Sequence, residues 1–162
     1  MRYPLLASLA ATLALASCGD SPATADAGYK SLQGGDYAAA LATFDMVLAG
    51  VSTEDTGYKS AALDRLQALA HVDAEQSKAG FISLLEGGMH MEAKDFSLIA
   101  TELNAAGEAG LAVFIIDKGR KALPEDELIQ KLLAKAIVEA KKDPKSKGAS
   151  ALVGLGYLGD DD

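Results

Sequence analysis

The chain has 162 residues, 49% of them hydrophobic, and a formal net charge of −8 at pH 7. This length is enough to bury one hydrophobic core. The acidic balance argues against nucleic acid as a partner and against a cationic helix on a membrane surface, because both need clusters of Lys and Arg. The single cysteine excludes an internal disulfide framework.

Residues 1–17 are predicted to be a signal peptide. Arg2 precedes an unbroken run of small or apolar residues, Leu5 to Ala16, which has the length of a signal-peptide core and is too short to span a bilayer. The run ends in Leu15-Ala16-Ser17-Cys18, which is similar to the lipobox of bacterial lipoproteins. An ordinary secretory signal with a chance cysteine is the alternative.

The lipobox resemblance implies that Cys18 carries a diacylglyceryl group and anchors the mature chain to a membrane. Residues 18–27 are then the acylated cysteine and a short polar tether. In a cell with two membranes, Gly19 after the cysteine resembles lipoproteins sent to the outer membrane. We therefore expect the protein in the bacterial cell envelope, at the outer membrane and facing the periplasm.

The rest of the chain is predicted to be all-α. Apolar residues recur at helical spacing from Ala23 to Lys142, and no segment shows the sustained alternation of a strand. Two start signals support helices: Ser52 to Asp55 as a capping box, and Asp73 as an N-cap with Gln76 three residues later. Gly, Asp and Pro interrupt the pattern at Gly34–Gly35, Gly50–Thr53, Asp73, Gly87–Gly88, Gly107, Pro124 and Pro144.

An internal repeat follows from sliding the sequence by 72 residues. The segment GDYAAALATFD, starting at Gly35, then aligns with GEAGLAVFIID, starting at Gly107. The shift is twice 36, close to two helix–turn–helix units of about 34 residues each. A degenerate unit is expected between them, and the best-fitting register puts Ala79 at its small position and Ser83 at its aromatic position.

These features resemble the tetratricopeptide repeat, although the characteristic Trp is absent. The matching residues of the first and third units are Gly28, Gly35, Tyr37, Ala40 and Phe44, and Phe96, Ile99, Ala100, Leu103, Gly107, Ala112, Ile116 and Pro124. The resemblance implies a short right-handed solenoid of about three helical hairpins over residues 28–124. It also implies a concave groove that binds extended or helical peptides. The groove positions are Tyr29, Gln33, Asp64, Lys94, Ser97, Thr101 and Asn104.

Residues 125–143 are predicted to be a helix that caps the open end of the solenoid. The tail, residues 144–162, combines apolar residues such as Leu152 and Tyr157 with the acidic end Asp160 to Asp162. We expect a short helix that packs back on the cap. The alternative is an exposed docking segment.

The sequence predicts neither an enzyme nor a metal site nor a cofactor. It has two histidines, His71 and His90, and no known catalytic or phosphate-binding motif. The run Met89-His90-Met91 points its side chains in different directions on a helix, so it cannot chelate as a set. His71 is interpreted as a helix C-cap.

The leading hypothesis is a lipid-anchored envelope scaffold or adaptor that binds a protein or peptide partner. The alternative is an envelope binding module for a metal or other small ligand. A small envelope enzyme is disfavoured because paired catalytic carboxylates are missing. Self-association through the apolar tail is a further possibility, and the sequence leaves the oligomeric state open.

Overall fold

The computed structural model describes residues 24–159 and confirms the all-α prediction: the described part contains helices and no strand. The predicted signal peptide, Cys18 and Asp160 to Asp162 lie outside the described residues. None of the described helices is long and apolar enough to cross a membrane. The helices are α1 (Ala25–Gln33), α2 (Tyr37–Ala49), α3 (Tyr58–Val72), α4 (Ala74–Glu86), α5 (Ala93–Ala105), α6 (Ala109–Ala122), α7 (Glu127–Lys142) and α8 (Lys147–Gly154).

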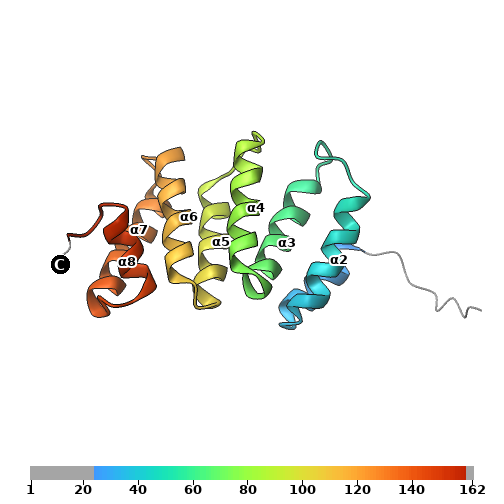
Figure 1. The fold of residues 1–162 in the computed structure, drawn as a ribbon. Helices are drawn as coiled ribbons and strands as arrows, with labels where there is room; N and C mark the ends of the chain where they lie inside the picture. Colours follow the sequence, from blue (N-terminus) through green and yellow to red (C-terminus); the bar gives the residue numbers. More distant parts are fainter. Residues whose placement is uncertain (1–23, 160–162) are drawn as a thin grey trace, which may run out of the picture.

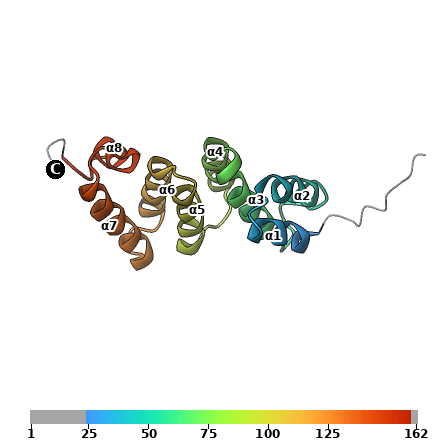
Figure 2. The ribbon, with the colours of Figure 1, turned by 90° about the horizontal axis from the view of Figure 1, so that it is seen from below.

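The helices form an elongated row that runs from α1 and α2 at one end to α7 and α8 at the other (Figure 1). A perpendicular view shows two layers, with the odd-numbered helices in one and the even-numbered helices in the other (Figure 2). The main core lies in the middle of the row, between α3 and α7. Smaller clusters stabilise the two ends, one around Phe44 and one around Leu152.

Three even-numbered helices, α2, α4 and α6, begin with the same pattern. An acidic residue occupies the N-cap, a small buried residue follows four positions later, and a large buried residue follows after four more. The three sets are Asp36, Ala40 and Phe44; Asp73, Ser77 and Phe81; and Glu108, Ala112 and Ile116. The Asp36 and Asp73 carboxylates accept hydrogen bonds from the backbone N–H three residues later, as N-caps do.

The predicted register of the middle unit is wrong by two residues. Ala79 and Ser83 are exposed, whereas Ser77 and Phe81 are fully buried. The Ser77 hydroxyl donates a hydrogen bond of 2.8 Å to the Leu66 carbonyl, so a buried polar residue is satisfied where alanine was expected. Sequence comparison missed this position because serine does not match alanine by type.

Glycine lets neighbouring helices approach closely, as Gly28 and Gly119 show. A Cβ atom at Gly28 in α1 would lie 2.9 Å from the Phe44 ring of α2. A Cβ atom at Gly119 in α6 would lie 2.9 Å from Ile129 of α7 and 3.1 Å from Phe96 of α5. In both places a missing side chain faces a large one, and the space between the helices is filled.

Two predicted boundaries differ from the structure. Ser52 to Asp55 does not start a helix. The Asp55 carboxylate accepts a hydrogen bond of 2.7 Å from the Ser52 N–H, but the contact closes a turn and α3 begins only at Tyr58. At the N-terminal end, α1 begins at Ala25 with Thr24 as N-cap, inside the segment predicted to be a tether.

The predicted capping helix is not the last element, because the tail forms a further helix. Asp126 caps α7, accepting hydrogen bonds from the N–H groups of Leu128 and Ile129, and Ser146 caps α8. Leu152 of α8 is fully buried in the cluster shared by α6, α7 and α8. The described part of the tail therefore packs on the array, and α7 with α8 makes a fourth helical hairpin.

Candidate functional site

A pocket of about 350 Å³ opens between α5 and α7, lined also by the first two turns of α6 and the first turn of α8. Most of its lining is apolar and small, and the polar lining residues come from α5, α7 and the α7–α8 turn. The apolar lining residues are Ala100, Ala109, Ala112, Val113, Ile116, Leu132, Ala136, Ala140 and Gly148. The polar ones are Thr101, Asn104, Lys135, Glu139, Asp143 and Ser146.

The pocket exists because small side chains face each other across it. Ala100 comes from α5, Ala112 from α6, and Ala136 and Ala140 from α7. Ala136 and Ala140 are four residues apart and therefore lie in one row on the helix surface. Short side chains on all three helices leave the space between them open, in contrast to the filled contacts at Gly28 and Gly119.

The polar groups of the pocket are available for a ligand. Within residues 24–159, the side chains of Thr101, Asn104 and Lys135 make no hydrogen bond or ion pair. The Glu139 carboxylate instead accepts a hydrogen bond of 2.8 Å from the Lys142 ammonium group. Lys142 also lowers the pKa of Glu139, which keeps this carboxyl group ionised at neutral pH.

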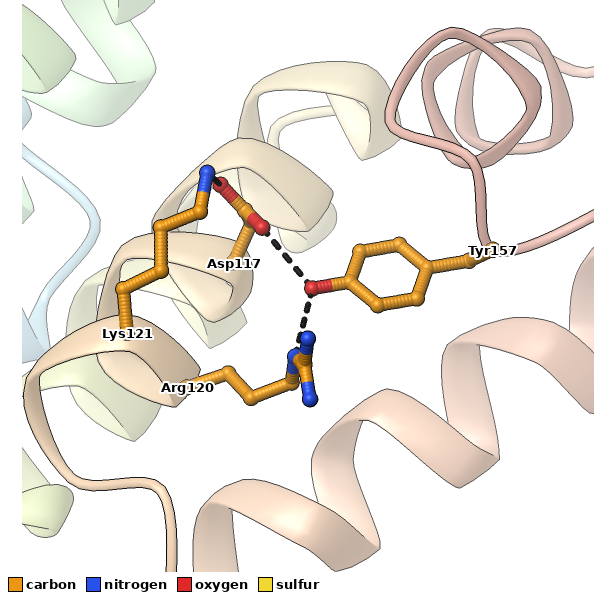
Figure 3. Close-up of polar contacts among 4 residues, drawn as sticks. All are labelled: Asp117, Arg120, Lys121 and Tyr157. Carbon is orange, nitrogen blue, oxygen red and sulfur yellow. Dashed lines mark hydrogen bonds and ion pairs between the residues drawn. The ribbon is translucent and has the colours of Figure 1, made fainter.

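A polar network around the buried Asp117 attaches the segment that follows α8, one wall of the pocket, to α6 (Figure 3). The Tyr157 hydroxyl donates a hydrogen bond of 2.8 Å to the Asp117 carboxylate and accepts one of 2.8 Å from Arg120. The Lys121 ammonium donates to the other oxygen of Asp117 at 2.7 Å. Asp117 is only 2% exposed, so these partners compensate for burying its charge.

The network also sets the protonation of its two central groups. Burial by itself would raise the pKa of Asp117, but the hydrogen bonds from Lys121 and Tyr157 outweigh it and the pKa is lowered. Burial, together with the hydrogen bond to Asp117, raises the pKa of Tyr157. At neutral pH the network therefore pairs an ionised carboxylate with a protonated tyrosine, the combination that the hydrogen bond requires.

The structure brings together two of the predicted groove residues, Thr101 and Asn104, at the pocket. Lys94 and Ser97 lie nearer the other end of α5, and neither lines the pocket. The Lys94 ammonium pairs with Glu92 at 2.9 Å, and that contact raises the pKa of Lys94.

The other predicted groove residues lie on helices that do not line the pocket. Tyr29 and Gln33 are exposed on α1, at the far end of the row. Asp64 on α3 is partly buried and accepts a hydrogen bond of 2.8 Å from Gln67. Burial raises the pKa of Asp64, and the Gln67 hydrogen bond opposes that effect only in part.

Sequence reasoning missed the contribution of α7, which it treated only as a cap. Lys135 and Glu139 both line the pocket and lie four residues apart on one helix face. The available signal was that Leu132 is followed by the smaller Ala136 and Ala140 along the inner face of α7. An apolar face whose side chains are smaller toward the C-terminal end of the helix indicates looser packing against the neighbouring helix at that end.

The prediction that His71 is a helix C-cap is wrong: Asp73 is the C-cap of α3, and His71 instead joins three helices. Its ring stacks on Tyr37 of α2 with centroids 3.8 Å apart, and its Nε2 atom lies 2.9 Å from a Glu102 oxygen of α5. His90 is exposed beside the buried Met91. Among the described residues, no group of three or more His, Cys, Asp or Glu side chains is placed to hold a metal ion.

Comparison with known proteins finds no match to any family model, curated protein or solved structure. Functional inference for this chain therefore rests on its own residues and their geometry.

Proposed function

We propose that the protein is a lipid-anchored scaffold or adaptor of the bacterial envelope that binds a protein or peptide partner. We infer that α1 to α6 form three tetratricopeptide-like hairpins of a right-handed solenoid. The repeated starts of α2, α4 and α6 and the two-layered row support this interpretation. In such an array the odd-numbered helices line the concave face.

The observation that carries the proposal is the pocket between α5 and α7. Peptide recognition needs a hollow for an apolar side chain and nearby groups that bond to the peptide backbone. The alanine-rich lining supplies the first, and the Thr101 hydroxyl and Asn104 amide supply the second. The amide of Asn104 both donates and accepts, so it matches the paired N–H and C=O groups of a peptide unit.

Site-specific photocrosslinking in the native cell tests where the partner binds. A photoreactive residue placed at Thr101 should capture a discrete protein partner, and the same group at the exposed Ala79 of α4, an even-numbered helix, is the control. Filling the pocket by Ala136→Leu should abolish the adduct at Thr101. An adduct that survives Ala136→Leu would place the partner elsewhere on the array.

The lipid anchor is tested separately at Cys18, which lies outside the described residues. Labelled palmitate should be incorporated into the wild-type protein but not into Cys18→Ala. The wild type should fractionate with outer membranes, and Cys18→Ala should leave the membrane fraction. A wild-type protein that is unlabelled and soluble would contradict the anchor.

The second candidate function is a binding module for a metal or other small ligand, and the pocket volume favours the small ligand. A volume of about 350 Å³ falls at the lower end of the range of small-molecule pockets, about 300–1,000 Å³. A screen of small apolar compounds by thermal shift distinguishes the two functions. Compounds that stabilise the wild type but not Ala136→Leu, without any crosslinked partner, would favour the small-ligand module.

A further inference from the structure

We propose that the segment bound at the pocket is acidic: it inserts an apolar side chain between α5 and α7 and presents carboxylates to Lys135 and Lys145. This inference rests on the proposed peptide-binding function and specifies the chemistry of the partner. It follows from the distribution of charge around the pocket.

The hairpin of α7 and α8 is basic, although the whole chain carries a formal charge of −8. Residues 127–147 contain six lysines against three acidic residues. Four of these lysines fall within the seven residues from Lys141 to Lys147, in the turn that borders the pocket. This turn therefore carries a local excess of lysines on an otherwise acidic molecule, while the pocket lining itself holds Lys135 together with the carboxylates of Glu139 and Asp143.

Intramolecular carboxylates neutralise only part of this charge. Lys131 pairs with Glu127 at 3.1 Å, Lys142 with Glu139 at 2.8 Å, and Lys147 with Glu108 at 2.8 Å. Within residues 24–159, no carboxylate lies within ion-pair distance of Lys135 or Lys145. Lys135 lines the pocket, and Lys145 sits in the turn between the lining residues Asp143 and Ser146.

The two carboxylates of the pocket already have partners, because Glu139 pairs with Lys142 and the Asp143 carboxylate accepts a hydrogen bond from the Lys145 backbone N–H. Lys135 and Lys145 have no ion-pair partner, and together with the apolar hollow they favour one class of ligand. A carboxylate near an inserted apolar side chain completes the missing ion pairs, whereas a basic flank meets like charge. The lysines lie beside a hollow that accepts a side chain. A peptide can fill the hollow and pair with the lysines, whereas the planar headgroup layer of an anionic membrane has no side chain to insert.

The acidic C-terminus of the chain itself does not fit as the occupant. Tyr157 is already bonded to Asp117 and Arg120, and Leu158 packs in the cluster with Leu152. Residues Gly159 to Asp162 contain no apolar side chain to insert. These residues do not supply the occupant, and we assign the segment to another protein.

Selection from a random peptide library on the purified full chain tests the proposal without assuming a partner. Enriched peptides should combine an aliphatic or aromatic residue with a net negative charge. Enrichment of neutral or basic peptides that Ala136→Leu no longer retains would overturn the acidic-partner inference and leave the peptide-binding function standing. No enrichment at all would count against the peptide-binding function itself.

Charge reversal then locates the recognition. The affinity for one selected acidic peptide is measured by fluorescence anisotropy. Lys135→Glu should raise the dissociation constant by at least about tenfold, and added salt should weaken binding to the wild type. The matched control is Lys30→Glu, because Lys30 is an exposed lysine on α1 with no ion pair, at the other end of the row. It should change binding by less than about twofold, since it alters net charge without touching the pocket.

Two results would overturn the assignment of charge to this site. One is an equal effect of Lys135→Glu and Lys30→Glu, which would mean that only net charge matters. The other comes from vesicles containing phosphatidylglycerol: if Lys135→Glu reduces flotation with these vesicles but leaves peptide binding unchanged, the lysines serve a membrane surface.

Discussion

The α1–α2 contact and the α5–α7 contact use small residues with opposite results. At the first, Gly28 faces the Phe44 ring so closely that a Cβ atom would lie 2.9 Å from it. At the second, Ala100 faces Ala136 and Ala140 across a pocket of about 350 Å³. A small residue opposite a large one closes a helix contact, and small residues opposite each other leave it open.

This difference separates stability from binding within one array. The tight end gains free energy by filling its core, while the open end keeps a hollow that contributes no packing energy until a ligand fills it. Substitutions at the two ends should therefore act on different properties.

The largest effect is expected at the tight end. Phe44 is fully buried between α1, α2 and α3, so Phe44→Ala leaves a cavity that the surrounding helices cannot close. We expect a loss of about 3–5 kcal/mol in the free energy of unfolding, measured by urea denaturation. A loss below 1 kcal/mol would show that this end is not tightly packed.

Adding methyl groups should have opposite effects at the two ends. Gly28→Ala forces a Cβ atom against the Phe44 ring, and we expect a cost of about 1–2 kcal/mol after the gain in helix propensity is subtracted. Ala136→Leu extends into the pocket, and we expect a change between zero and a gain of about 1 kcal/mol. Equal destabilisation by both substitutions in thermal melts would remove the distinction between the two contacts.

Tyr157→Phe should loosen the α8 wall of the pocket. The substitution removes both hydrogen bonds of the hydroxyl and leaves Asp117 with Lys121, so we expect a loss of about 1–2 kcal/mol in stability at pH 7. We also expect weaker peptide binding, because Gly148 of α8 lines the pocket.

The pH dependence gives this prediction a distinctive signature. The pKa of Asp117 is lowered on folding, so its contribution is present above its unfolded pKa of about 4 and is lost as pH falls through the folded pKa. The pKa of Tyr157 is raised, so its contribution is present below its unfolded pKa of about 10 and is lost as pH rises through the folded pKa. The stability difference between wild type and Tyr157→Phe should shrink at both extremes, and a difference independent of pH would contradict the network.

The smallest expected effect is at Asp64. Burial raises the pKa of this carboxyl group, so its ionised form reduces stability at neutral pH. Asp64→Asn should raise the free energy of unfolding at pH 7 by less than about 1 kcal/mol, because the side chain is only partly buried. The gain should disappear as pH falls below about 4, where aspartate is protonated in the unfolded chain. Exposed Asp26 provides the matched control through Asp26→Asn.

The helix signals that sequence reasoning read correctly are local ones. The N-cap Asp73 and the glycine breaks at Gly35 and Gly107 depend on residues at most a few positions apart. Gly35 and Gly107 have φ angles of +77° and +83°, a conformation that glycine adopts without strain. The Ser52 signal failed because the same hydrogen bond that caps a helix also closes a turn.

The sequence by itself determined the all-helical class, the positions of most helix breaks and the small-to-large pairs of the first and third units. Only the tertiary structure decided that Ser77 replaces alanine in the middle unit, that Tyr157 reaches Asp117, and that α5 and α7 leave a pocket. Ser77 and Leu66 are 11 residues apart and Tyr157 and Asp117 are 40 apart, so no local pattern predicts either contact. The pocket depends on which side chains of distant helices face each other, and a repeat pattern does not specify that.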